Sequence, residues 1–486
     1  MKKIVNFFKL KEHNTSVKVE IYAGIATFLA MAYILVVNPN NLLIDGNIDP
    51  RWSSVFVATA IGSFIGTLLM ALIANKPFGA SSTMGVNAMI GTVIGGSLGF
   101  SFSYGNGMLI ILCSGIVFFL LSVIPVGKKG CKVSLREALF DGMPKCIINA
   151  VPVGIGLFIT FIGLKNSGII ISNKYTLLQL LDFGSSENFM LGGPAWGAIV
   201  TLFGLVVIAV LTHYKVKGSV IIGILSSTLL AIPTKVANLD ILLGKVDKIS
   251  WKFWENISSY FSNDGVFLSV FKEGFNLPDG SLFTFIILVM TFIMLDLFDT
   301  IGTIVGCATN AGLNDENGKP EDYNKIMYAD SATTVMSAIV GTSTVSTFVE
   351  SGAGIAEGGK TGLTGLTIAI LFLLSIFFLP LFAFIPIEAA SSALIYVGVL
   401  MIKNIKTIDF DNVIESVPAF LTIIVMPLAY SITDGIGIGV ITYFFINLFI
   451  YFIDLVKGNK KKFPLSIVTT CITILFLIYF LVPTIV

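Results

Sequence analysis

Long runs of apolar residues are the feature that most limits what this chain can fold into. A helix needs roughly 20 consecutive apolar residues to cross the hydrocarbon core of a membrane. The chain has 486 residues, of which 55% are hydrophobic and only 12% are charged, and a soluble fold cannot bury that much apolar surface. The sequence therefore predicts an all-α protein that crosses the membrane many times. The apolar segments lie at about residues 21–37, 52–74, 106–125, 146–163, 194–212, 218–233, 282–308, 325–340, 362–385, 388–402, 416–431, 434–455 and 464–485.

The rest of the composition argues against several classes of function. A net charge of +1 argues against nucleic acid as a partner. The only histidines, His13 and His213, lie in basic or polar segments, and no Ser/His dyad or metal-ligand set is visible, so neither an enzyme nor a metal site is predicted. The five cysteines show no spacing typical of disulfides or zinc ligands. No long apolar stretch precedes Ile21, which argues against a cleaved signal peptide.

Two glycine-rich stretches, at about 83–93 and 350–358, are too short to span a bilayer as ordinary helices. Each follows a run of small or hydroxyl-bearing residues, at 79–83 and at 342–347. Short interrupted segments at corresponding places in two halves of a membrane protein are the best sequence pointer to a transporter's binding site. The sequence thus predicts a carrier with its polar site near the middle of the membrane.

Two aspartates lie inside the apolar run from Leu282 to Ala308. Asp296, Asp299 and Thr303 share one helical face because their spacing is i, i+3 and i+7. An ionisable side chain at that depth is costly and normally faces a cavity or a partner. We therefore interpret this stripe as a binding surface for a proton and a ligand. Asp296 has a structural alternative, in which neighbouring hydroxyl groups satisfy its carboxylate.

Glu350 and Asn87 open the two interrupted segments. A buried carboxylate in the position of Glu350 can carry a proton and accept hydrogen bonds from the N–H of a heterocycle. The alternative for Glu350 is a helix cap, which the helix dipole also favours. The Asn87 amide offers both a donor and an acceptor, which suits a heterocyclic base. For Asn87 a cap or a helix-to-helix hydrogen bond remains equally open.

The stretch from Gly354 to Thr361 matches the phosphate-binding pattern G-x-x-x-x-G-K-[ST] in every position. A functional loop of that kind needs a buried strand before it and a soluble helix after it. Here the flanks are Ser/Thr-rich and apolar membrane sequence, so we interpret the match as accidental.

Charge and internal likeness suggest how the chain is arranged. The residues 147–152 resemble 413–418 and indicate an internal repeat, and a polar stretch at 235–281 links the two halves. Lysines near the N-terminus, at 128–132 and at 215–217 should face the cytoplasm. A model of 14 spans agrees with these three clusters but would place the lysines at 457–462 outside, which leaves the number of segments open by about one.

Several stretches together resemble the nucleobase–cation symporter 2 superfamily, and specifically its AzgA-like branch of adenine, guanine and hypoxanthine permeases. Among them are Gly85-Val86-Asn87-Ala88, Asp296-Leu297-Phe298-Asp299-Thr300-Ile301-Gly302-Thr303 and Val349-Glu350-Ser351. The other matching stretches are residues 27–34, 37–39, 154–164, 341–344, 356–364, 414–420 and 434–436. The resemblance covers nearly the whole chain.

That resemblance implies about 14 transmembrane segments in two inverted repeats of seven, with short strands and half-helices in segments 3 and 10. It also implies a core domain and a gate domain that move against each other like an elevator, and dimers formed through the gate domains. The corresponding boundaries are a cytoplasmic N-terminal segment at 1–20, core domain at 21–127 and 282–402, gate domain at 144–233 and 413–486, and the linking loop at 235–281.

The resemblance further implies a purine bound between the two strands. Asp299, Glu350 and Asn87 would bind it directly. Phe348 and Val349 would offer backbone groups and a stacking face, with Thr27 and Phe28 nearby. Glu350, Asp299 and Asp296 would be the proton-coupling carboxylates, and the proton would be the coupling ion without any other cofactor.

The predicted function is therefore proton-coupled uptake of adenine, guanine or hypoxanthine across the cytoplasmic membrane. The alternatives are a carrier of the same fold for uracil, xanthine or a small anion, and a channel. The expected partners are a purine base, membrane lipid and a second copy of the chain.

Overall fold

The structure is a computed structural model, and it describes only part of the chain. The described residues are 2–43, 49–95, 101–126, 133–134, 143–216, 218–241, 243, 249–311, 313, 321–348, 350–457 and 465–481. Within these ranges the side chains at 2–4, 125–126, 133–134, 294, 297–299, 301–302, 305–311, 356, 433 and 479 are not described.

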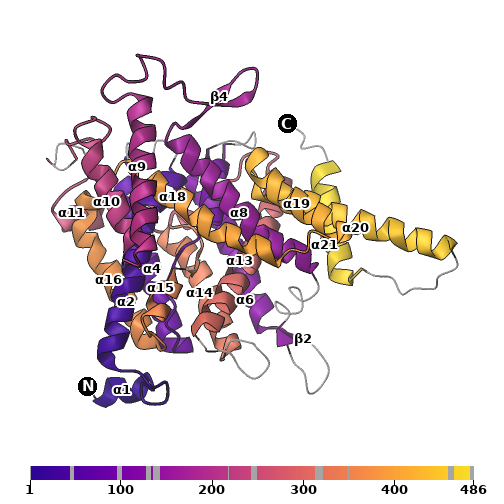
Figure 1. Ribbon diagram of the computed structural model, residues 1–486. Coiled ribbons are helices and arrows are strands. Elements are labelled where there is room, and N and C mark those ends of the chain that lie inside the picture. The colour runs from indigo at the N-terminus through magenta and orange to yellow at the C-terminus, as the bar shows by residue number, and fades with distance from the viewer. Residues whose placement is uncertain are drawn as a thin grey trace.

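Helices make up most of the described chain (Figure 1). The first half contains α1 (Lys2–Phe7), α2 (Val17–Met31), α3 (Ile34–Leu42), α4 (Trp52–Leu69), η2 (Met70–Ala74), β1 (Ala80–Ser82), α5 (Met84–Ile94), α6 (Tyr104–Val123), β2 (Pro125–Val126), β3 (Val133–Ser134), α8 (Lys145–Asn166), β4 (Ile170–Asn173), β5 (Leu177–Leu180), α9 (Pro194–His213) and α10 (Ser219–Ala231). The second half contains α11 (Phe253–Phe261), α12 (Ser269–Lys272), α13 (Leu282–Ala311), α14 (Tyr323–Val340), β6 (Val345–Thr347), α15 (Ser351–Ala356), α16 (Gly362–Leu374), η3 (Ser375–Phe378), α17 (Leu379–Ala383), α18 (Ile387–Met401), η4 (Ile402–Thr407), α19 (Val413–Leu428), α20 (Ile432–Val456) and α21 (Ile467–Leu481).

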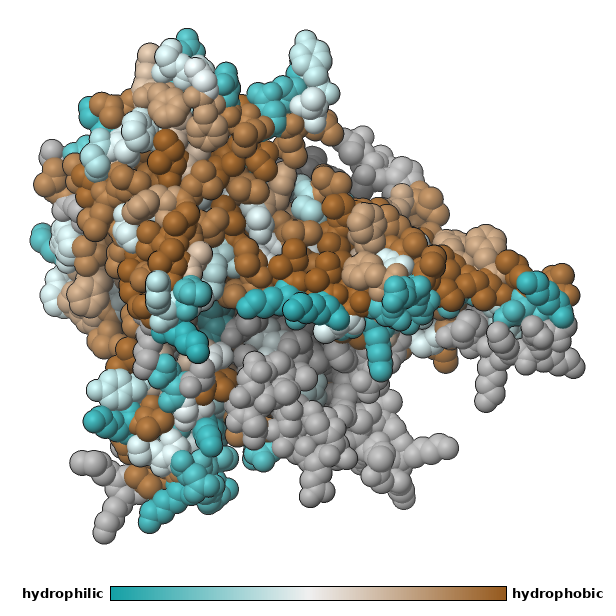
Figure 2. Space-filling view, in the orientation of Figure 1, coloured by the Kyte–Doolittle hydropathy of each residue, from teal (hydrophilic) through white to brown (hydrophobic). Residues whose placement is uncertain are grey.

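Eight helical stretches among the described residues are long and apolar enough to cross a membrane. Shorter apolar helices, including α5, α10 and α19, add to them. Brown, apolar side chains cover much of the surface seen in Figure 2, and α20 exposes Phe449 and Phe452 along its length. Apolar side chains exposed in this way are stable against lipid and not against water. The predicted multi-pass helical membrane protein is therefore confirmed.

A two-stranded sheet joins distant parts of the chain at its centre. β1 pairs antiparallel with β6, with Ser81 opposite Ser346. Each strand is followed along the chain by one of the two short glycine-rich stretches. These stretches fold as the short helices α5 and α15, which confirms the predicted half-helices.

Hydroxyl groups complete the hydrogen bonding of this sheet inside the protein. A strand within a membrane must satisfy every backbone group internally. Thr67 of α4 does so on the outer edge of β1, because its Oγ1 accepts from the Ala80 N–H at 2.9 Å and donates to the Ala80 carbonyl at 3.0 Å. Ser63, also of α4, forms a hydroxyl–hydroxyl hydrogen bond of 2.6 Å with Ser81 of β1.

Asn38 ties the approach to β6 to α3 and α4. Its Nδ2 donates to Thr59 Oγ1 at 2.6 Å and to Thr342 Oγ1 at 2.9 Å, and its Oδ1 accepts from Ser343 Oγ at 3.1 Å. Asn38 is fully buried. Its amide thus fixes where the chain enters the second strand, directly in front of the half-helix α15.

Helices α8, α9, α10, α18, α19 and α20 pack against one another. α8 packs against α18 and α19, α9 against α10 and α18, and α19 against α20. In Figure 1 α20 projects to the right of the molecule, and α21 stands beside its inner end. Of the lysines at 457–462, only Lys457 belongs to the described residues, at the end of α20. The core and gate boundaries remain a prediction.

Candidate functional site

A carboxylate stands at the start of the half-helix α15. Glu350 is the N-cap residue of this helix, but its side chain makes no capping hydrogen bond. Instead its Oε1 accepts a hydrogen bond from the Tyr33 hydroxyl at 2.6 Å. Glu350 as a whole is partly buried. The side chain therefore does not cap α15, and its predicted roles in binding and proton coupling stay predictions.

Tyr33 is a site residue that the sequence prediction missed. It lies in the break between α2 and α3 and is 2% exposed. Its hydroxyl is also 4.0 Å from the sulfur of Met84, the first residue of α5. Tyr33 therefore stands between the starts of both half-helices. The only sequence signal for it was its place in the stretch 27–34; in the structure it lies two residues after the end of α2.

Asn87 lies in the first turn of α5 and is completely buried. Neither its Nδ2 nor its Oδ1 has a hydrogen-bond partner among the described residues. A buried amide left unpaired costs roughly 1–3 kcal/mol for each unsatisfied group, so such groups normally meet a ligand or water. Among the described residues this amide therefore neither caps a helix nor links two helices, and its donor and acceptor groups are of the kind that a ligand could use.

Three threonine hydroxyls on neighbouring elements are also buried without a partner in the described part of the chain. They belong to Thr27 of α2, Thr300 of α13 and Thr347 of β6. The elements that carry them contact each other, since α15 packs on α2 and α13, and α13 packs on β6 and α5. Unsatisfied polar atoms are rare in a protein interior. Their concentration around the crossing strands therefore marks the place where a polar ligand would be bound.

Other predicted binding residues occupy the same region. The Phe348 N–H donates to the Gly79 carbonyl at 2.9 Å, and the ring is 6% exposed. Phe28 of α2 packs edge-on against Phe372 of α16 with ring centres 5.2 Å apart, so its contact with a ligand stays a prediction. Val349 lies outside the described residues.

The two aspartates lie on the long helix α13. The carboxylate of Asp296 is buried and accepts from Thr334 Oγ1 of α14 at 3.1 Å. This hydroxyl contact fits the structural alternative for Asp296, and its part in proton coupling stays a prediction. The side chain of Asp299 lies outside what the structure describes, so its predicted role stays a prediction as well.

The stretch that matches a phosphate-binding loop binds a carboxylate of the protein itself. Its backbone N–H groups at Lys360 and Thr361 donate to Glu20 of α2 at 3.1 and 3.2 Å. The stretch joins the end of α15 to the start of α16, which is not the strand-to-helix turn that nucleotide binding requires. Glu20 is completely buried and fills the position of an anion, so the interpretation of an accidental match is supported.

Taken together, the site offers a carboxylate, a phenol and an amide around the meeting point of two half-helices. The carboxylate can hold or release a proton, the phenol donates to it, and the amide both donates and accepts. Such a set suits a small, uncharged, planar molecule with N–H and C=O or ring-nitrogen groups on its edge. No group of three or more His, Cys, Asp or Glu side chains that could hold a metal occurs in the described ranges.

Comparisons with known proteins agree with this architecture. The sequence model described as "Permease family" (Xan_ur_permease) matches residues 18–438. The adenine permease AdeQ of Escherichia coli (strain K12) is 35% identical over 436 residues, covering 90% of this chain and 88% of AdeQ. The guanine/hypoxanthine permease PbuO of Bacillus subtilis (strain 168) is 36% identical over 438 residues, covering 90% and 93%.

One solved structure with a similar fold is the transmembrane domain of a cyanobacterium bicarbonate transporter, BicA. It superposes with a TM-score of 0.57 at 14% identity, covering 86% of this chain and 97% of that domain. At this low identity the likeness concerns the fold alone.

Proposed function

This chain belongs to the Permease family, and we propose that it carries purine nucleobases across the cell membrane, with adenine, guanine and hypoxanthine as the substrate class. The names of the similar permeases AdeQ and PbuO support this class. The site supports this substrate class independently, because its side chains are hydrogen-bonding groups and not a cluster of charges of one sign.

The observation that carries the proposal is the amide of Asn87, which has no partner among the described residues. It lies in the half-helix α5, whose first residue, Met84, contacts the Tyr33 hydroxyl that is hydrogen-bonded to Glu350. A purine presents N–H donors and acceptor nitrogens or oxygens along one edge, and an amide pairs with such an edge in two places. A carboxylate has about four acceptor sites, so that of Glu350 can accept a further N–H besides the Tyr33 hydroxyl. A small anion fits this arrangement poorly, since a carboxylate would repel it.

Proton coupling follows from the same carboxylate. In the proposed cycle Glu350 takes up a proton on the side of lower pH, and the base then binds against it. Neutralising the carboxylate lowers the cost of carrying the site through the membrane. Asp299 would complete the binding set, and Asp296 would hold α13 against α14. The cycle needs no cofactor apart from the coupling proton.

The finer architecture belongs to the proposal too. It consists of about 14 segments in two inverted repeats, with core and gate domains that move like an elevator. The antiparallel pairing of β1 with β6 supports it, because two strands related by an in-plane twofold axis must run in opposite directions. Dimers through the gate domain would leave this sheet free to move.

Uptake of radiolabelled adenine, guanine and hypoxanthine by a host lacking purine transport tests the proposal. Wild type should concentrate at least one base, and a protonophore should abolish that accumulation. Glu350→Gln should lose proton-driven uptake while Glu12→Gln, a change of the same kind at an exposed residue, should keep it. Strong uptake by Glu350→Gln would move the proton to another carboxylate.

The same assay separates the alternatives. Competition by unlabelled uracil or xanthine in place of the three purines would assign a different base to the same fold. Base flux that never exceeds the external concentration would indicate a channel. No base uptake by well-expressed wild type would refute the substrate class.

A further inference from the structure

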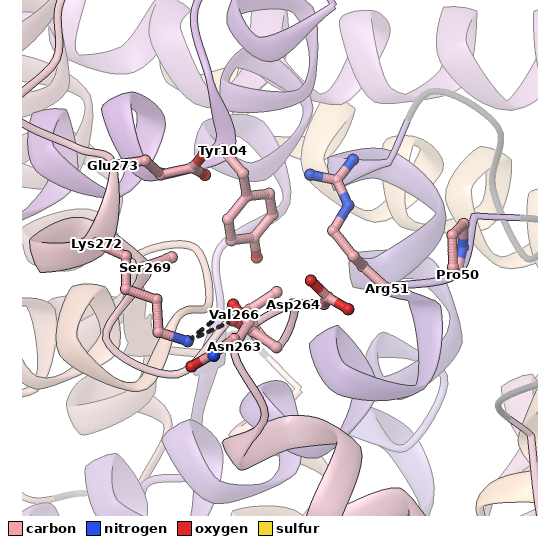
Figure 3. A pocket seen from close by; sticks show the side chains of 10 residues that line it. Pro50, Arg51, Tyr104, Asn263, Asp264, Val266, Ser269, Lys272 and Glu273 are labelled. Atoms are coloured by element: carbon pink, nitrogen blue, oxygen red, sulfur yellow. Dashed lines mark hydrogen bonds between the residues drawn. The ribbon is translucent and has the colours of Figure 1, made fainter.

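A cavity of about 380 Å³ lies at the far end of the molecule from the N-terminus. It opens between the starts of α4 and α6 and the segment that includes α12 (Figure 3). The apolar stretch Val17–Leu42 separates the N-terminal segment from this end, so the cavity faces the side opposite the basic N-terminus. By the positive-inside rule that side is the outside of the cell. The central site around Glu350 is a different place in the fold.

One cation of the cavity wall, Lys272, is already fully hydrogen-bonded by the protein itself. The ammonium group of Lys272 donates to the carbonyls of Ser262, Asn263 and Gly265 at 2.9, 3.3 and 3.1 Å, which uses all three of its donors. Figure 3 shows Lys272 bent over this turn. Lys272 therefore builds the wall and is not offered to a ligand.

Arg51 is only partly committed. Its Nε and Nη2 donate to the two oxygens of Asp49 at 3.1 and 2.9 Å, which leaves three of the five guanidinium N–H groups without a partner in the described part of the chain. Hydrogen bonding to Asp49 raises the pKa of Arg51, so the group stays charged. The guanidinium lies over the ring of Tyr104, with its carbon 5.6 Å from the ring centre.

Hydrogen-bond acceptors stand across from these donors. Glu273 Oε1 accepts the Gly105 N–H at 2.9 Å, and among the described residues its second oxygen has no partner. Asp264 is exposed at the rim. Ser269 is 4% exposed, and no described residue bonds its hydroxyl. In Figure 3 Arg51 and Glu273 appear on either side of Tyr104.

The charges select the class of ligand. Asp49 neutralises Arg51, and the remaining Lys272, Asp264 and Glu273 leave an excess of negative charge, which disfavours anions. Free guanidinium donors opposite free carboxylate acceptors match the two kinds of group on the edge of a heterocyclic base. Guanidinium planes also stack on bases. The volume lies in the range of small-molecule sites, roughly 300–1,000 Å³.

We propose that this cavity is a second, outer binding site for a nucleobase, held between Arg51 and the carboxylates of Glu273 and Asp264. The identity of its ligand rests on the proposed function, because the base available at the outer face is the one to be carried. The wall of the cavity contacts the backbone that leads into β6 of the central sheet, since the Tyr104 hydroxyl donates to the Gly341 carbonyl at 2.8 Å. Gly341 directly precedes the segment that Asn38 anchors in front of β6.

Equilibrium binding to the purified full chain tests this site, with radiolabelled adenine, guanine and hypoxanthine used one at a time. The wild type should bind two molecules of base per chain. The double variant Asp264→Asn with Glu273→Gln should lose one of them, with binding at the outer site weakened at least about tenfold for a lost charge-assisted hydrogen bond. Gln at 273 can still accept the Gly105 N–H, so folding is preserved. Asp279→Asn, an exposed aspartate in the same segment but outside the cavity, is the matched control and should bind two.

Glu350→Gln distinguishes failure of this inference from failure of the proposed function. The inference holds if Glu350→Gln still binds one base and the double variant in that background binds none. It is overturned if wild type binds one base, Glu350→Gln binds none and the double variant binds like wild type, and the proposed function then stands. If wild type binds none of the three bases, both are overturned.

Discussion

Replacing Glu20 tests how a buried carboxylate holds the half-helix region together. Its Oε2 accepts from the Thr361 N–H at 3.2 Å, the Thr361 hydroxyl at 2.8 Å, the Thr364 N–H at 3.3 Å and the Thr364 hydroxyl at 2.6 Å. Among the described residues its Oε1 accepts from the Lys360 N–H alone. Four of the five donors therefore converge on one oxygen, and they bind the start of α16 to α2.

The expected cost depends on what the substitution leaves behind. Glu20→Ala leaves the buried N–H groups of Thr361 and Thr364 without an acceptor, at about 1–3 kcal/mol each, so the loss should be about 2–6 kcal/mol. The hydroxyl groups can turn to other acceptors and add little. Glu20→Gln can place its carbonyl where Oε2 stands and its NH₂ toward Lys360, so it keeps four of the five bonds. It should lose about 1–2 kcal/mol, mainly because neutral hydrogen bonds are weaker than charge-assisted ones.

Thermal unfolding of the detergent-purified chain, followed by the fraction that stays soluble and monodisperse, measures these effects. The midpoint should fall in the order wild type, Glu20→Gln, Glu20→Ala. Glu12→Ala is the control, because Glu12 makes only an exposed ion pair with Lys9, and such pairs contribute little. If Glu20→Ala is as stable as wild type, or if glutamine is as harmful as alanine, the convergence on one oxygen does not stabilise the fold as argued.

Three further changes have definite expected outcomes. Tyr33→Phe removes the hydrogen bond to the carboxylate at the start of α15, and initial uptake rates should shift in their dependence on external pH while expression stays normal; an unchanged pH profile would contradict the role of the phenol. Gly354→Ala adds a methyl group against Thr27 Oγ1 and the Ala23 carbonyl, so α15 must move away from α2 and uptake should fall at least about tenfold, whereas wild-type uptake would show that α15 has room to shift. The hydrogen bond from Lys325 lowers the pKa of Asp322. The pair therefore stabilises the fold at neutral pH, and this contribution is lost as the pH falls through the lowered pKa. Asp322→Asn should flatten the acidic part of a plot of unfolding midpoint against pH.

Much of the site's composition could be predicted from the chain alone. The short glycine-rich stretches were recognisable because a segment too short to span a bilayer must be interrupted inside it. Glu350 and Asn87 were recognisable because burying an ionisable or amide group in a membrane costs free energy, so such a group normally faces a partner or a cavity. Long apolar runs determined the class of fold, since so much apolar surface is stable only in a membrane.

Only the tertiary structure decided which groups meet. Tyr33 reaches Glu350 across 317 positions of the chain, and Glu20 reaches Thr361 across 341. Hydrogen bonds between side chains so far apart leave no periodic signal in the sequence, because they depend on the pairing of β1 with β6 and on the packing of α2 against α16. For the same reason the sequence showed the carboxylates but did not show whether each one caps a helix, joins two helices by hydrogen bonds or binds a ligand. Local composition determined where polar groups are buried, and the packing of distant helices decided what each of them binds.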